Sequence, residues 1–510
     1  MTAAFARVPE LAAQHLLLAM AALTLGALIA LPLAVLAARR PTLARIALGF
    51  ASLVQTIPAL ALLALFYPLL LALSGLVGGG IPALGFLPAL IALTLYALLP
   101  ILRNAVTGIT GIPPSLIEAA DGIGMTAAQK LRLVEAPLAA PVAMAGIRTA
   151  AVWTIGAATL STTVGQPSLG DMIFSGLQTQ TWTLVLAGCI AAAALAIGVD
   201  ALLALVERGI ATRRPWLAWA GLGALLAATL AAAAPLLRPG QPVVTVGAKN
   251  FSEQFILARL IGARLEAAGY AVRYREGLGS SVAFAALAGG DIDVYVDYAG
   301  TVWNGEMKRG DVPPRAQMLH EIARWTQAER GVRTLGALGF ENAYAFAMKA
   351  DVARAKGIAN LNDLARASPG LALGSDLEFL DRAEWSAVRR AYPMRFASAT
   401  AYSPSFMYRA IDSGRADVIT AFSSDGRIAA QKLVVLPDPK GAIPAYDAIL
   451  LLAPARANDA RFAAALRPLI DSIPVAAMRE ANYMVDRDTD KASPEAAARW
   501  LERQIADSSE

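Results

Sequence analysis

The first 240 residues contain six apolar runs, each near the roughly twenty residues that a helix needs to cross the hydrocarbon core of a bilayer. Lipid offers no water, so the backbone groups of a spanning segment must bond within it, which makes the segment helical. The runs are Leu16–Ala38, Ala47–Leu73, Leu84–Leu102, Ala143–Val164, Thr183–Val206 and Trp216–Leu237. The sequence therefore predicts an N-terminal all-α polytopic membrane bundle of about six spans.

The basic residues of this part predict its orientation. The first 240 residues hold 12 Lys/Arg and 7 Asp/Glu, while the rest of the chain holds 32 of each, so the net charge of +5 lies in the first part. The basic residues near the predicted loops alternate so as to face one side, which the positive-inside rule assigns to the cytoplasm. They are Arg39, Arg40, Arg45, Arg103, Lys130, Arg132, Arg148, Arg208, Arg213 and Arg214. The N-terminus and everything after Leu237 are then extracytoplasmic.

Two features of the bundle remain open. The sixth run follows Arg213-Arg214 and ends in the small residues Ala231–Ala234, so it is either an uncleaved anchor, which we favour, or an internal signal sequence. Asp200 lies inside the fifth run, where a charge is costly and often functional. It is also within two turns of Glu207 and Arg208, so a position facing the bundle near the cytoplasmic end is equally compatible.

After Val243 the pattern changes to short β-rich runs that alternate with amphipathic helices. Val243–Val246 and Ala271–Arg275 read as strands around the helix Glu253–Ala267, and a second set runs from Leu371 to Leu436. Such alternation is typical of mostly parallel α/β sheets. The predicted fold is a two-lobed α/β domain of the periplasmic-binding-protein type, with its ligand in the cleft between the lobes.

These patterns divide the chain into three predicted parts. They are a transmembrane domain at 1–214 with a cytoplasmic loop at 103–141, a sixth span and tether at 215–240, and an extracytoplasmic domain at 241–510. Lobe 1 is expected at about 243–342 plus 447–510, and lobe 2 at about 346–440.

Several function classes are disfavoured by composition. Cys189 is the one cysteine, and the two histidines, His15 and His320, lack metal-site spacing, so we expect no metal, no cofactor and no catalytic residue in this chain. Gly-Lys followed by Ser or Thr occurs nowhere, so there is no P-loop. The basic charge has no clustered face with stacking aromatics, so no nucleic-acid partner is expected.

The predicted cytoplasmic loop contains a specific spacing. Glu118-Ala119-Ala120 is followed by Gly124 and then by Val134-Glu135-Ala136-Pro137. The pattern resembles the EAA loop of ABC importer permeases, with Ala136 where that family usually has leucine. The resemblance implies that Glu118, Ala119, Ala120, Gly124 and Pro137 couple the bundle to an ATPase.

Further sequence segments make this resemblance more specific. Gln55-Thr56-Ile57-Pro58 and Ile147-Arg148-Thr149-Ala150 look like permeases of osmoprotectant (glycine betaine/choline/carnitine) importers, and the likeness covers residues 15–210. Gly247–Gln254, Tyr295–Thr301 and Ile443–Asp447 look like the binding proteins of the same systems. The resemblance implies a permease fused to its binding protein, a separate ATP-binding dimer, and a second copy of this chain in the pore.

In that family, an aromatic box holds a quaternary ammonium. Matched position by position, the box residues here are Tyr298, Tyr344, Phe422 and Tyr446, with Phe422 where relatives often have tyrosine. Lys249, Arg382 and Thr301 fall on positions that grip a ligand carboxylate. A methylated ammonium has no N–H to donate, so cation–π faces and methyl packing must recognise it.

The ligand and two rival functions stay open at this point. Glycine betaine, choline, carnitine, proline betaine and ergothioneine all suit a cation box. A membrane-anchored solute sensor would not need the coupling loop, and a membrane-anchored enzyme lacks a plausible His or Cys constellation.

Overall fold

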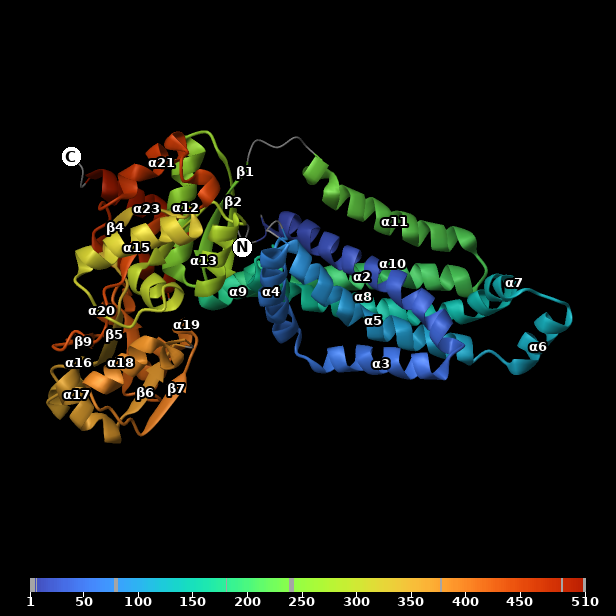
Figure 1. Cartoon of the computed structure of the whole chain (residues 1–510), viewed down its shortest axis with the longest axis horizontal. Helices are drawn as coiled ribbons and strands as arrows, with labels where there is room; N and C mark the ends of the chain where they lie inside the picture. Colours follow the sequence, from blue (N-terminus) through green and yellow to red (C-terminus); the bar gives the residue numbers. More distant parts are fainter. Residues whose placement is uncertain are drawn as a thin grey trace. The chain divides into compact units, whose positions relative to one another are not determined.

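The computed structural model describes residue 5 and residues 7–77, 81–179, 181–237, 243–376, 378–487 and 489–507. Residues 78–80 of a predicted extracytoplasmic loop, 238–240 of the predicted tether and 241–242 of the predicted binding domain lie outside this set. The chain forms two compact units, a helical unit and an α/β unit, and each is considered by itself (Figure 1).

The segment Ser175–Trp182 groups with the second unit, although it holds the ends of two helices that lie mostly in the first. The described residues up to Leu237 form helices that are joined by loops. They are α2 (Val8–Ala38), α3 (Pro41–Thr56), α4 (Ala59–Leu76), α5 (Phe86–Thr110), α6 (Pro114–Gly122), α7 (Ala127–Lys130), η1 (Leu131–Glu135), α8 (Ala136–Ala158), η2 (Thr159–Val164), α9 (Gly170–Gln178), α10 (Trp182–Ala211), α11 (Pro215–Ala233) and η3 (Ala234–Leu237). Six helical segments among the described residues are long and apolar enough to span a membrane, which confirms the predicted number.

The predicted second span is wrong in its bounds. The run Ala47–Leu73 is divided into α3 and α4 because Ile57 adopts an extended conformation, with φ −76° and ψ 125°. Proline lacks an N–H and its ring disfavours helical geometry in the preceding residue, so Pro58 ends α3 at this point. Of the two helices, α4 is the one long enough to span.

The helical unit packs mainly through small residues. α2, α5 and α8 form its centre, where Ala30, Ala34, Ala97 and Ala150 are fully buried. Small side chains let helix backbones approach closely, which drives association in lipid where helices gain little from hydrophobic burial. Large apolar side chains such as Leu28, Leu76 and Ile197 are exposed on the unit, as expected for lipid-facing positions.

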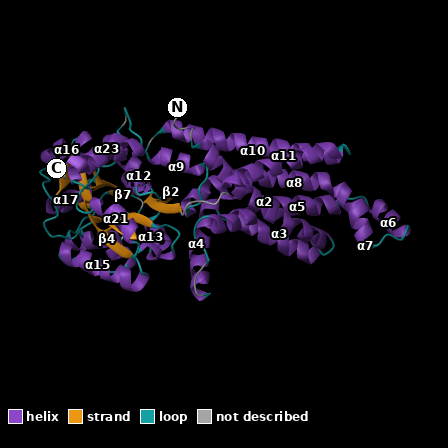
Figure 2. Ribbon diagram, turned by 90° about the horizontal axis from the view of Figure 1, so that it is seen from above, coloured by secondary structure: helices purple, strands orange, loops and turns teal. Residues whose placement is uncertain are grey.

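The second unit contains two five-stranded sheets. The first has the order β2-β1-β3-β10-β4, and the second has the order β7-β6-β8-β5-β9. Their strands are β1 (Val243–Lys249), β2 (Ala271–Leu278), β3 (Val294–Tyr298), β4 (Arg333–Glu341), β5 (Tyr344–Lys349), β6 (Ala372–Ser375), β7 (Ser398–Ala401), β8 (Val418–Phe422), β9 (Leu433–Leu436) and β10 (Asp447–Leu452). Helices pack around the orange strands in Figure 2.

Each sheet combines parallel and antiparallel pairs. β1 is parallel to β2 and β3, while β10 is antiparallel to β3 and β4. The second sheet repeats this scheme, with β6 parallel to β7 and β8, and β5 antiparallel to β8 and β9. The chain passes from one sheet to the other between β4 and β5 and returns between β9 and β10. Such a pair of α/β lobes is the fold predicted for this half. The expectation of mostly parallel sheets is wrong, because β10 and β5 each run antiparallel to both of their neighbours.

The helices around these sheets include the two that matter most for the site. α12 (Ser252–Ala267) follows β1, and α18 (Ala383–Ala391) lies in the second lobe. The others are α13 (Ser280–Gly289), α14 (Ala299–Thr301), η4 (Val302–Glu306), α15 (Arg315–Arg330), α16 (Ala350–Lys356), α17 (Leu361–Ala367), η5 (Ser368–Gly370), η6 (Phe379–Asp381), α19 (Pro404–Asp412), α20 (Arg427–Ala430), η7 (Pro454–Arg456), α21 (Ala460–Leu466), η8 (Arg467–Leu469), α22 (Val475–Asp486) and α23 (Pro494–Asp507).

Candidate functional site

The four predicted box residues all lie at ends of strands near the crossings between the lobes. Tyr298 ends β3, Tyr344 begins β5, and Phe422 ends β8 directly opposite Tyr344 in the antiparallel register. Tyr446 stands immediately before β10. Strand ends in α/β sheets are where ligands bind, so the fold gathers these rings where a ligand would lie.

Tyr344 contacts two of the other three rings. The ring centroids of Tyr344 and Phe422 are 5.3 Å apart with a tilt of 42°, and Tyr446 meets Tyr344 edge-on at 5.7 Å and 88°. Aromatic pairs favour such tilted and edge-to-face geometries. Gly300 makes room for this packing, since a Cβ there would lie 2.5 Å from the Tyr446 ring.

Tyr298 joins this cluster through a ring that the sequence reasoning missed. Phe251 stacks on Phe422 at 6.3 Å with an interplanar angle of 2°, and on Tyr298 at 6.1 Å. Phe251 lies just before α12, inside the phrase Gly247–Gln254 that carried the family resemblance. Its aromatic character within that phrase was the signal that could have identified it.

The phenol groups of this cluster are neutral. Burial raises the pKa of Tyr298, Tyr344 and Tyr446 well above that of a free tyrosine. Each hydroxyl also donates to a carboxylate: Tyr298 to Glu253 at 2.6 Å, Tyr344 to Asp376 at 2.9 Å, and Tyr446 to Glu384. These hydrogen bonds fix the rings in place and leave their faces as neutral π surfaces.

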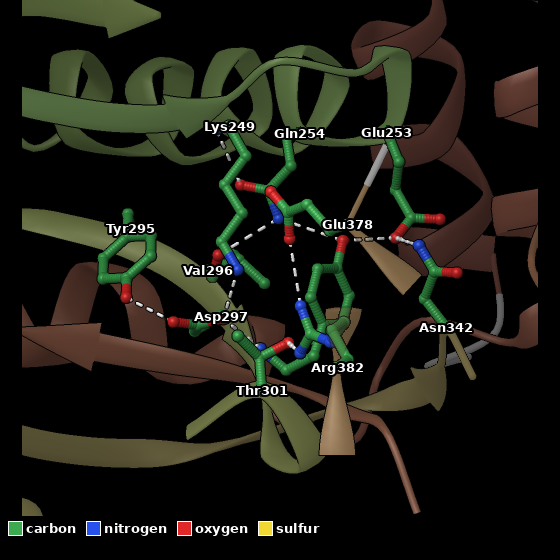
Figure 3. Close-up of polar contacts among 11 residues, drawn as sticks. Lys249, Glu253, Gln254, Tyr295, Val296, Asp297, Thr301, Asn342, Glu378 and Arg382 are labelled. Carbon is green, nitrogen blue, oxygen red and sulfur yellow. Dashed lines mark hydrogen bonds and ion pairs between the residues drawn. The ribbon is translucent and has the colours of Figure 1, made fainter. Parts of the chain in front are cut away.

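Lys249 lies on the Tyr298 side of the site and already has a counter-charge. Its ammonium forms an ion pair with Asp297 (Figure 3). It also lies 5.3 Å from the Tyr298 ring centroid. Asp297 also accepts the Tyr295 hydroxyl at 2.5 Å and the Tyr298 backbone N–H at 2.7 Å. A buried charge needs such a partner to offset the loss of water.

Arg382 and Thr301 lie together on the Tyr344 side. The Arg382 guanidinium donates to Thr301 Oγ1 at 3.5 Å (Figure 3). It lies 5.6 Å from the Tyr344 ring centroid. It also pairs with Glu378 at 3.0 Å and with Glu384 at 3.1 Å. The structure therefore brings these two predicted residues together and gives the arginine two carboxylate partners from its own chain.

Glu253 is a further buried group that the sequence reasoning did not identify. Besides the Tyr298 hydroxyl, its carboxylate accepts hydrogen bonds from Asn342 at 3.0 Å and Asn482 at 2.8 Å. Burial raises its pKa, while these donors act in the opposite direction. Glu253, Asn342 and Asn482 also line a pocket with Phe251 and Phe422, whereas the three predicted tyrosines are not among the residues that line it.

The predicted coupling loop forms a helix–turn–helix in the first unit. Glu118 and Ala119 are exposed on α6, and Ala120 is buried. Gly124 occupies the left-handed region with φ +75°, which glycine adopts without a Cβ clash. The next helix starts with a capping box at Thr126 and Gln129, and Pro137 is exposed on the first turn of α8.

Among the described residues, no group of three or more His, Cys, Asp or Glu side chains is arranged to hold a metal ion. His320 is exposed on α15, and His15 is buried in α2, where it contacts the backbones of Ile155 and Leu169.

Two protein-family models match the chain. Residues 242–503 match the substrate binding domain of the ABC-type glycine betaine transport system. Residues 30–212 match the inner membrane component of binding-protein-dependent transport systems.

Some curated relatives match the permease part alone, and EgtU matches both parts. The choline transport system permease protein OpuBB of Bacillus subtilis (strain 168) is 44% identical over 38% of this chain and 84% of its own length. The glycine betaine/carnitine/choline transport system permease protein OpuCB of the same organism is 43% identical over 39% and 85%. The ergothioneine transport permease/ergothioneine binding protein EgtU of Helicobacter pylori (strain G27) is 29% identical over 88% and 81%.

Proposed function

This chain is a multi-pass membrane protein of the osmoprotectant family of ABC importers, a permease fused to a substrate-binding domain, and we propose that it captures and translocates a quaternary-ammonium solute. The proposal covers solutes such as glycine betaine, choline or carnitine. The observation that carries it is the contact of Tyr344 with Phe422 and Tyr446 at the lobe crossings, next to Arg382.

The chemistry of these rings supports a methylated cation as the ligand. A quaternary ammonium cannot donate a hydrogen bond, so a site for it gains from neutral ring faces. Tyr298, Tyr344 and Tyr446 are held neutral by burial and oriented by carboxylates, and those carboxylates add negative potential behind the rings. We propose that Lys249, Arg382 and Thr301 set the polar end of the ligand, with the rings at the cationic end.

The importer needs partners outside this chain. An ABC importer permease works with an ATPase, and we propose that a separate ATP-binding dimer docks on the loop around Gly124. We further propose that two copies of this chain form the pore, and that the chain itself has neither a catalytic residue nor a cofactor. ATP-driven closure of the dimer then switches the helical unit to release solute inward.

A relative that spans both parts favours a second candidate ligand. That protein is named as an ergothioneine permease and binding protein, and it carries the same fusion of parts. Ergothioneine is itself a betaine with a trimethylammonium group, so it would use the same ring faces. We propose it as the alternative solute.

Direct binding tests the proposal. The purified full chain in detergent is titrated calorimetrically with choline, glycine betaine, carnitine and ergothioneine, and with glucose, leucine and dimethylethylamine as ligands without a quaternary nitrogen. We expect saturable binding of at least one quaternary ammonium and none of the other three. Binding of glucose or leucine alone would contradict the proposal.

A further inference from the structure

Glu384 is a buried carboxylate at the edge of the aromatic cluster with one oxygen left over. It lies in the first turn of α18 with a relative exposure of 1%. Its Oε1 accepts hydrogen bonds from the Tyr446 hydroxyl and from Arg382 Nε. Its Oε2 is buried and accepts no hydrogen bond of normal length and angle from the residues that the structure describes.

An unpartnered buried oxygen of this kind needs an explanation. Native structures satisfy most buried polar atoms, and leaving a charged acceptor without a donor is costly. Burial raises the pKa of Glu384. The charge of Arg382, the nearby side chains of Tyr446 and Asn304, and the backbone N–H of Glu384 together lower it by more, so the pKa lies below the ordinary glutamate value. The free oxygen is therefore a negatively charged acceptor.

The charges around the rings also favour a cationic ligand over one with a carboxylate. Lys249 is neutralised by Asp297, and Arg382 is shared by Glu378 and Glu384. These five side chains carry two positive and three negative formal charges. A ligand carboxylate would have to compete with a carboxylate of the chain for either basic group, whereas a cation meets a surplus of negative charge.

We infer that Glu384 is a specificity-determining residue whose Oε2 accepts a hydrogen bond from a hydroxyl or N–H group of the bound quaternary ammonium. The inference rests on the proposed function and narrows its substrate class. The favoured solute carries a donor and no carboxylate at the end opposite its methylated nitrogen. A zwitterionic betaine would bring its carboxylate towards Glu384 and be repelled.

Choline and glycine betaine are a matched pair for this test, because both carry trimethylammonium and differ in having a hydroxyl or a carboxylate. A third ligand, (2-methoxyethyl)trimethylammonium, keeps the cation and removes the donor. Titration of the wild-type full chain should show choline binding at least about tenfold tighter than either of the others, because a hydrogen bond to a charged acceptor is strong. This comparison needs no mutation and is independent of any folding defect.

The variant Glu384→Gln tests the residue itself. It keeps the size of the side chain and removes its charge, so the choline-to-betaine affinity ratio should fall by about tenfold. The control Asp412→Asn removes one charge from an exposed ion pair with Lys349 in the same lobe and should leave the ratio unchanged. A wild-type preference for glycine betaine, or an unchanged ratio in Glu384→Gln, would overturn the inference while leaving quaternary-ammonium binding intact. Failure of these three ligands, and also of carnitine and ergothioneine, to bind would overturn the proposed function as well.

Discussion

Phe422 is the ring of the cluster that can be tested with the fewest side effects. It is half-buried, and its ring centroid lies 5.3 Å from that of Tyr344 and 6.3 Å from that of Phe251. It has no hydroxyl, so its removal leaves no buried hydrogen-bond partner unsatisfied. Phe422→Ala removes a face worth about 0.5–2 kcal/mol of cation–π attraction, and 1.4 kcal/mol corresponds to tenfold. Choline affinity, measured by calorimetry on the full chain, should therefore fall by a factor between severalfold and more than tenfold.

Phe422→Tyr is the matched control for that prediction. It keeps the ring face and adds the hydroxyl that related binding proteins often have, so affinity should stay within about threefold of wild type. If Phe422→Ala binds as tightly as the wild type, this ring does not contact the cation.

The rings could be predicted from the sequence, but the groups that hold them could not. Tyr298, Tyr344, Phe422 and Tyr446 were matched from local phrases, and their role as ligand contacts stays a prediction. Their carboxylate partners come from distant positions, as in the Tyr446–Glu384 pair, 62 residues apart. Short phrases carry no information on such pairs, because folding alone decides which distant side chains meet.

At the level of elements, the turn at Gly124 makes a sharp prediction. Proline requires φ near −65°, whereas Gly124 adopts +75° and its N–H donates to the Asp121 carbonyl. Gly124→Pro should therefore disrupt the loop and abolish solute-stimulated ATPase activity in the assembled complex. Choline binding should persist, because this turn belongs to the helical unit and the rings belong to the α/β unit.

A neighbouring glycine provides the control. Gly122 ends α6, and a Cβ there meets nothing within 4 Å, so Gly122→Ala should retain stimulation. Undiminished stimulation in Gly124→Pro, measured in proteoliposomes, would remove the coupling role from this loop.

The helices also show where pattern reading reaches its limit. Six spans follow from apolar length, but the division of the second run into two helices was not predicted, since hydropathy does not distinguish one long helix from two shorter ones. Arg148, counted near a cytoplasmic loop, lies inside α8, where it donates to Asp200 and Glu207 of α10 at 2.8 Å each. This ion pair accounts for the charge of Asp200 within an apolar helix.

For the whole molecule, the topology can be tested by labelling. In a Cys189→Ser background, Ser74→Cys near the end of α4 should react with an impermeant maleimide added outside intact cells. Ala211→Cys at the end of α10 should react only after the membrane is opened. The reason is that the basic residues near Ala211 favour the cytoplasm. Labelling of Ala211→Cys but not of Ser74→Cys in intact cells would contradict the predicted orientation.

Transport itself tests the account most directly. The full chain is reconstituted with its ATPase into proteoliposomes that enclose ATP, and radiolabelled choline is added outside. We predict accumulation that requires hydrolysable ATP, is suppressed by excess unlabelled quaternary ammonium, and is unaffected by glucose or leucine. Accumulation of glucose or leucine with no ATP-dependent uptake of choline, glycine betaine, carnitine or ergothioneine would contradict the account.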